Sequence, residues 1–120
     1  MKVAYWIIVA LLAVLYLYSG GKKAVQSREQ LAPMMAWVDT IPMWLVRGIG
    51  LVEIIGVIGL ILPPSTGIAP VLALLAAIGF AVLQVLATGL HLSRGEVKVV
   101  GFNIVLIALA VVTAWLATAW

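Results

Sequence analysis

Residues 43–62 read MWLVRGIGLVEIIGVIGLIL, a continuous apolar run interrupted near its middle by one acid, Glu53. About 20 apolar residues are what an α-helix needs to cross a hydrocarbon core of about 30 Å. The run therefore predicts a membrane-spanning helix. An acid at that depth costs about 2.5–3.5 kcal/mol to insert, so we expect Glu53 to face the interior of a bundle or a wet cavity rather than lipid.

Three further apolar runs of similar length, at about 3–20, 68–90 and 97–120, flank this one. The chain is 66% hydrophobic and 9% charged, with a mean hydropathy of +1.28, whereas a soluble domain is roughly 45–50% apolar and 25% charged. Continuous runs indicate helices, because membrane strands alternate over about 10 residues. The sequence predicts an all-α integral membrane bundle of four transmembrane helices, forming a single domain over residues 1–120.

The first run has an alternative interpretation as a secretory signal peptide, because it begins with a lysine and is apolar throughout. No small-residue cleavage site of the A-x-A type follows it, and Lys22 and Lys23 come directly after the run. A secretory signal peptide ends in such a cleavage site. We therefore expect this run to stay in the protein as its first membrane helix.

The links between the runs are unequal in length and charge. Residues 62–67, LPPSTG, predict a tight hairpin between the second and third helices, and residues 91–98 form a short polar link. The first and third links and their adjoining residues hold six of the seven basic residues: Lys22, Lys23, Arg28, Arg47, Arg94 and Lys98. Since cytoplasmic loops are rich in Lys and Arg, this distribution predicts a multi-pass protein with these links in the cytoplasm and both termini outside.

The long first link, residues 21–42, has a pattern of its own. Ser27 is followed three residues later by Gln30, which is typical of a capping box at a helix start. The apolar residues after it indicate a short amphipathic helix lying at the membrane interface. They are Leu31, Met34, Met35 and Trp37. Asp39 or Thr40, followed by Pro42, is predicted to cap the second membrane helix.

Polar side chains in the other three helices fall at helical spacing and at a similar predicted depth. The first helix offers Tyr16 and Ser19, the third Gln84 and His91, and the fourth Asn103. Steps of three and four residues keep such side chains on one face of a helix. Small and apolar residues continue these faces, namely Ala73, Ala77, Ala81 and Thr88 in the third helix and Ile107, Ala110, Ala114 and Ala117 in the fourth. We expect a polar cavity that opens toward the cytoplasm, with the acid of the second helix at its deep end.

Each of these residues has a structural interpretation beside the functional one. Glu53 is either a proton acceptor or ligand group, or a protonated acid that hydrogen-bonds to Gln84 or Asn103 and fixes the helix register. The two amides are either ligand contacts or interhelical bonds, which contribute roughly 0.6 kcal/mol each. His91 is a site residue or a capping histidine at a helix end. One histidine without a second ligand at suitable spacing, in a chain without cysteine, predicts no metal and no cofactor.

Several short motifs resemble those of one family. They are YSGGKKA at residues 18–24, Gly-x-x-Glu at residues 50–53, Leu-Pro-Pro at residues 62–64, His-x-x-Arg-Gly-Glu at residues 91–96, and an asparagine near the start of the fourth helix. In these features the chain resembles the DoxX-like family of small four-helix membrane proteins of bacteria, over essentially its whole length. The resemblance implies a bacterial cytoplasmic (inner) membrane protein. It also implies links to quinone or thiosulfate oxidation, to membrane oxidoreductase assemblies and, through fold relatives, to receptor-assembly chaperones and sterol isomerases.

Three functions remain open at this point. The first is a non-catalytic accessory protein of membrane redox or lipid metabolism, which binds a membrane lipid, a lipophilic small molecule or a partner membrane subunit through Ser19, Tyr16, Gln84 and Asn103. The second is a cofactor-free epoxide or double-bond isomerase with Glu53 and His91 as catalytic residues, since such reactions need only proton transfer. The third is a proton-coupled small multidrug transporter, although those proteins carry their acid in the first helix.

Small-residue faces also favour a homo-oligomer. A nucleic-acid partner is not expected, because the basic residues neither form a patch nor alternate with exposed aromatic residues. Some members of the family carry cysteines and this chain has none, which argues against a thiol-based role. The partners expected from the sequence are therefore membrane lipid, a lipophilic small molecule and a second copy or another membrane subunit.

Overall fold

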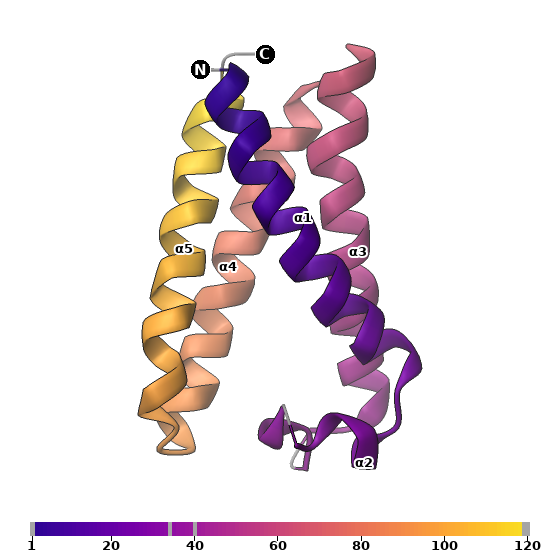
Figure 1. The fold of residues 1–120 in the computed structure, drawn as a ribbon, viewed down its shortest axis with the longest axis vertical. Helices are drawn as coiled ribbons and strands as arrows, with labels where there is room; N and C mark the ends of the chain where they lie inside the picture. Colours follow the sequence, from indigo (N-terminus) through magenta and orange to yellow (C-terminus); the bar gives the residue numbers. More distant parts are fainter. Residues whose placement is uncertain (1, 34, 40, 119–120) are drawn as a thin grey trace.

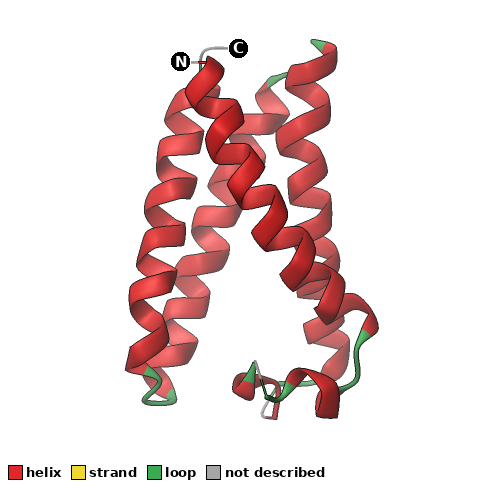
Figure 2. Ribbon diagram, in the orientation of Figure 1, coloured by secondary structure: helices red, strands yellow, loops and turns green. Residues whose placement is uncertain are grey.

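The protein is four long helices joined by one long and two short links (Figure 1). The structure, a computed structural model, describes residues 2–33, 35–39 and 41–118. The long helices are α1 (Lys2–Val25), α3 (Met43–Thr66), α4 (Val71–Ser93) and α5 (Val97–Ala117). Each is long and apolar enough to cross a membrane, and the described residues contain no strand (Figure 2). The predicted all-α bundle of four transmembrane helices is confirmed.

The helices pack as two close pairs, α1 with α3 and α4 with α5. Helix α1 crosses the bundle obliquely, from the end of α5 near the termini to the half of α3 that follows the long link (Figure 1). The main core lies where all four helices meet, and Tyr5, Leu12, Leu60 and Ala77 are buried there. The long link and the α4–α5 link lie at the end of the bundle away from the two termini (Figure 1). We call this end the link end.

Three helices end later than the sequence predicted, and one of them, α4, is shifted as a whole from about 68–90 to Val71–Ser93. Helix α1 continues to Val25, so Lys22 and Lys23 lie within its last turns rather than beyond it. Helix α3 continues through Pro63 and Pro64 to Thr66, and Gly67 ends it with a φ of 74°. The α3–α4 connection is still a tight turn, but the two prolines belong to the helix that precedes it.

The extension of α3 has a physical reason in the backbone of its last turns. A proline has no N–H to donate to the carbonyl four residues earlier, so Pro64 leaves the carbonyl of Leu60 without its usual helical partner. The buried hydroxyl of Tyr5 on α1 donates to that carbonyl. Thr66 Oγ1 donates to the carbonyl of Leu62 at 2.8 Å. The Tyr5 side chain thus replaces a backbone donor that a proline removes, the Thr66 hydroxyl adds a bond in the last turn, and the helix persists past its prolines.

The long link contains two short helical turns, α2 (Arg28–Leu31) and η1 (Ala36–Asp39), rather than one continuous helix. Ser27 forms the predicted capping box with Gln30, each bonding the other's backbone N–H through its side chain. A small second core under the link consists of Leu31, Met35, Val38 and Val46. The predicted cap of the second membrane helix is wrong for Asp39, because Pro42 occupies that position with no side-chain bond. Met34 and Thr40 lie outside the described residues.

Candidate functional site

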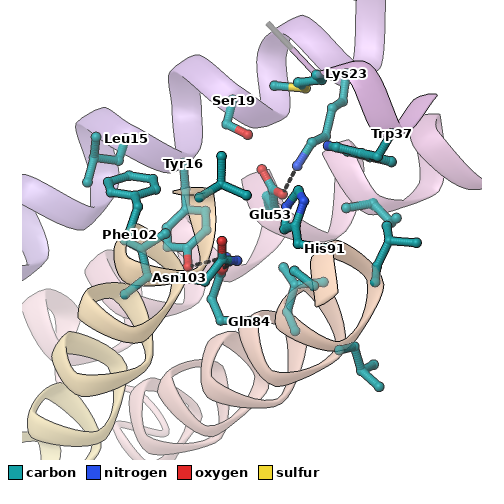
Figure 3. Close-up of a pocket in the computed structure, with 18 of the residues that line it drawn as sticks. Leu15, Tyr16, Ser19, Lys23, Trp37, Glu53, Gln84, His91, Phe102 and Asn103 are labelled. Carbon is teal, nitrogen blue, oxygen red and sulfur yellow. Dashed lines mark hydrogen bonds and ion pairs between the residues drawn. The ribbon is translucent and has the colours of Figure 1, made fainter. Parts of the chain in front are cut away.

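A cavity of about 660 Å³ lies inside the link end of the bundle, between the α1–α3 pair and the α4–α5 pair (Figure 3). Leu15, Leu83 and Leu106 line it toward the middle of the bundle, and Pro33 and Trp37 of the long link line its outer end. Most of its wall is apolar. Three groups of polar side chains interrupt that wall, and each group has a distinct geometry.

The first group is a buried ion pair between two helices. Lys23 Nζ of α1 donates to Glu53 Oε1 of α3 (Figure 3). Glu53 is 1% exposed and Lys23 is 8% exposed, and Lys23 Nζ also lies 5.5 Å from the centre of the Trp37 ring. Ser19, one turn earlier on α1, stands beside the same carboxylate. The acid that has no opposite charge near it in the sequence is therefore neutralised from another helix.

Two glycines bring this pair together. A side chain at Gly50 of α3 would place its Cβ 2.7 Å from the carbonyl oxygen of Gly20 on α1, and one at Gly20 would come within 2.8 Å of the carbonyl oxygen of Gly50. The two backbones thus touch at this point, as small residues permit in membrane helices. Lys23 and Glu53 each follow their glycine by three residues, so both lie on the face where the helices cross.

The end of α1 is held to α3 by a second basic residue. Arg47, which lies in α3 rather than in the link, donates from Nη1 to the backbone carbonyl of Lys23 at 3.1 Å. The last carbonyls of a helix have no partner within the helix, and a cation there also suits the helix dipole. Arg47 therefore fixes the last turn of α1 and, with it, the position of the lysine in the ion pair.

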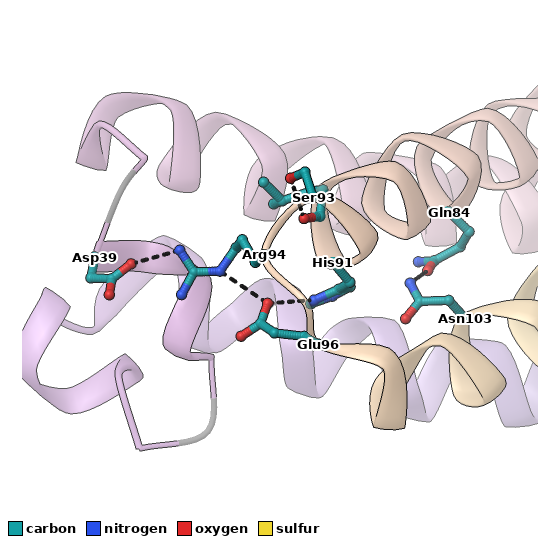
Figure 4. Close-up of polar contacts among 8 residues, drawn as sticks. Asp39, Gln84, His91, Ser93, Arg94, Glu96 and Asn103 are labelled. Carbon is teal, nitrogen blue, oxygen red and sulfur yellow. Dashed lines mark hydrogen bonds and ion pairs between the residues drawn. The ribbon is translucent and has the colours of Figure 1, made fainter.

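The second group is neutral, and we call it the amide–phenol chain: Tyr16 of α1, Gln84 of α4 and Asn103 of α5. Gln84 Nε2 donates to the hydroxyl of Tyr16 at 2.9 Å, and Asn103 Nδ2 donates to Gln84 Oε1 at 2.9 Å (Figures 3 and 4). The ring of Tyr16 stacks on Phe80 with 4.1 Å between centroids. The structural interpretation in which a protonated Glu53 bonds one of the amides is wrong, because Glu53 bonds Lys23 and the amides bond each other and the phenol.

The third group is a network of charged side chains that reaches the cavity wall through His91 and Glu96 (Figure 4). Glu96 Oε1 lies 3.0 Å from His91 Nδ1 and accepts from Arg94 Nε at 3.0 Å, while Arg94 Nη1 donates to Asp39 Oδ1 at 2.9 Å. This ties the α4–α5 link to η1 of the long link. Bonds from His91 and Arg94 lower the pKa of Glu96 below its ordinary value. Glu96 therefore stays ionised, and the contact persists, until the pH falls through that lowered value.

One of the comparisons with known proteins identifies a family. The model of the DoxX-like family matches residues 7–113. The chain belongs to the DoxX-like family. The resemblance that its short motifs indicated is thereby confirmed, and with four apolar helices it establishes a small integral membrane protein in contact with lipid. Neither a curated protein nor a solved structure matches the chain significantly.

All six residues singled out in this DoxX-like sequence line the one cavity: Tyr16, Ser19, Glu53, Gln84, His91 and Asn103. Sequence reasoning missed Lys23, which it took for a residue outside the membrane, and Glu96, which engages His91. One argument could have found Lys23: an unpaired acid at mid-membrane is costly, so Glu53 needs a positively charged partner from another helix. Among the described residues, no group of three or more histidines and acids is arranged to hold a metal ion.

Proposed function

We propose that this DoxX-like protein binds a lipophilic small molecule in the cavity at the link end, in an accessory role in membrane redox or lipid metabolism. One observation carries the proposal: buried polar side chains from all four membrane helices converge on a single cavity whose wall is otherwise apolar. A ligand pocket typically has 300–1,000 Å³ and a few placed polar groups in an apolar lining. The cavity volume of about 660 Å³ falls within that range.

The geometry of Glu53 favours binding over proton transfer. One carboxylate oxygen accepts from Lys23, and the other is buried on the side of Gly20. A general acid or base must reach the proton of its substrate within hydrogen-bond distance, and a proton-coupled transporter must expose its acid to a lipophilic cation. Both the isomerase and the transporter hypotheses therefore require the ion pair to open first, whereas a binding role does not.

Filling the cavity is expected to displace the ligand. Ala87 lines the cavity on α4, so Ala87→Phe should lower the occupancy of a co-purified small molecule at least tenfold, as seen by native mass spectrometry after gentle extraction. Ala108→Phe on α5 is the matched control, because Ala108 is exposed on the outside of the bundle. The occupancy of the co-purified molecule in this variant should equal that in the wild type. Extraction of all three proteins without any bound molecule would refute the binding role.

The orientation in the membrane is part of the proposal: the link end faces the cytoplasm, and both termini lie outside. The chain contains no cysteine. The labelling of a single introduced cysteine therefore shows on which side of the membrane that residue lies. In spheroplasts, a membrane-impermeant maleimide should label Thr66→Cys at the exposed end of α3 directly and Ser93→Cys at the exposed end of α4 only after permeabilisation. The opposite labelling pattern would place the termini in the cytoplasm and invert the direction in which the cavity opens.

A further inference from the structure

We infer that the ligand carries an uncharged head group that both donates and accepts hydrogen bonds, as an alcohol or a primary amide does, and that this head group binds the amide–phenol chain. The inference rests on the proposed binding function and adds the chemical class of the ligand. Two independent features of the cavity support it, namely the pairing of its charges and the unused hydrogen-bonding capacity of its neutral residues.

Every charged side chain on the cavity wall already has a partner within the protein. Lys23 is bonded to Glu53, and Glu96 is bonded to both His91 and Arg94. Arg94 in turn is bonded to Asp39 on the long link. A ligand with a net charge would find no free countercharge on this wall, and an uncompensated charge in a dry site is strongly disfavoured. The paired charges therefore select against anionic and cationic head groups.

The amide–phenol chain, in contrast, has donors and an acceptor that its two internal hydrogen bonds do not use. A primary amide has two N–H donors and an oxygen acceptor, and a phenol has one O–H donor. The two bonds in the chain use one N–H of Gln84, one N–H of Asn103, the oxygen of Gln84 and the hydroxyl oxygen of Tyr16. The O–H of Tyr16, the second N–H of each amide and the oxygen of Asn103 remain for another molecule.

These reserved groups are buried and face the cavity. Tyr16 is 3%, Gln84 6% and Asn103 5% exposed, and all three line the cavity wall. Buried polar groups in proteins are almost always hydrogen-bonded. Because both donors and an acceptor remain, a head group that offers both satisfies more of them than a simple ether or ester, which accepts only.

The apolar wall next to the chain suits the rest of such a molecule. Ile49 of α3, Leu86 of α4 and Phe102 of α5 line the cavity. Leu86 and Phe102 are also more than half exposed, so the apolar wall continues to the outer surface of the bundle, where lipid lies. An alkyl chain attached to the head group can therefore extend along this wall toward the hydrocarbon of the bilayer.

The test compares four probes that share a twelve-carbon chain: dodecanol, dodecanamide, laurate and dodecylamine, each radiolabelled, with the protein in phosphatidylcholine nanodiscs. Retention by nanodiscs that hold the Ala87→Phe variant is subtracted as partition into lipid. We expect dodecanol and dodecanamide to bind at least tenfold more tightly than laurate and dodecylammonium. Equal or tighter binding of a charged probe would overturn the head-group inference and leave the binding function standing. No binding of any probe, together with no co-purified molecule, would overturn both.

Variants of the amide–phenol chain test whether the head group binds there. Asn103→Leu should weaken dodecanol binding about tenfold, and Thr113→Val, which removes a buried hydroxyl of α5 away from the cavity, should not change it. Asn103→Asp keeps the shape of the side chain and adds an unpaired acid, so it should shift the preference toward dodecylammonium. Because Asn103→Asp is expected to gain binding of dodecylammonium, a misfolded protein could not produce this result. An Asn103→Asp protein that still prefers the alcohol tenfold would place the head group elsewhere.

Discussion

Lys23→Met is expected to destabilise the protein by about 3–5 kcal/mol, which is the typical cost of removing one partner from a buried ion pair. The substitution keeps most of the length of the side chain but leaves Glu53, at 1% exposure, without its cation. The low dielectric of the membrane interior offers the carboxylate no replacement for the lost partner. The free energy of unfolding in mixed micelles, titrated with a denaturing detergent, measures this loss.

Two variants separate the ion pair from other effects of the substitution. Lys22→Met changes the neighbouring lysine, whose ammonium lies 5.4 Å from the ring of Tyr18, and should cost less than about 0.5 kcal/mol, as surface changes do. The double variant Lys23→Met with Glu53→Leu should regain most of the stability, because no unpaired charge is left behind. Equal losses for Lys22→Met and Lys23→Met would show that the pair contributes nothing to folding.

The helices of this protein were predictable because lipid imposes a simple length rule on each of them. Four runs of about 20 apolar residues can only be four spanning helices, and the capping box at Ser27 needs no long-range information because its two residues are neighbours in sequence. The polar faces of the helices were predictable for a related reason: lipid excludes polar groups, so Glu53, Gln84 and Asn103 had to face inward.

The pairing inside the bundle was not predictable from local rules. Lys23 and Glu53 are 30 residues apart, and nothing near either residue indicates that α1 continues past Gly20 to bring the lysine inward. The prolines of α3 give the same lesson, because a local rule ends the helix there and only the hydroxyl of Tyr5, from α1, supplies the donor that Pro64 lacks. In both cases the decisive contact comes from a different helix.

Gly50→Ala is the second substitution with a large expected effect, a loss of about 1–3 kcal/mol in the free energy of unfolding, as overpacking of a close contact causes. The new Cβ would stand 2.7 Å from the backbone oxygen of Gly20 and 2.7 Å from Cβ of Lys23. A backbone atom cannot rotate away, so α1 must move off α3 to make room. That movement also lengthens the distance between Lys23 and Glu53, and the same titration in mixed micelles measures the total cost.

Gly48→Ala is the matched control, since a Cβ at Gly48 of the same helix would meet nothing within 4 Å. Alanine favours a helix over glycine by about 0.8–1.0 kcal/mol, so this variant should be neutral or slightly stabilised. The two large effects should also be coupled: in a Gly50→Ala background the ion pair is already strained apart, and Lys23→Met should then cost less than it does alone. Full additivity of the two substitutions would mean that the glycine crossing does not position the pair, and equal effects at Gly48 and Gly50 would mean that the crossing is not tight.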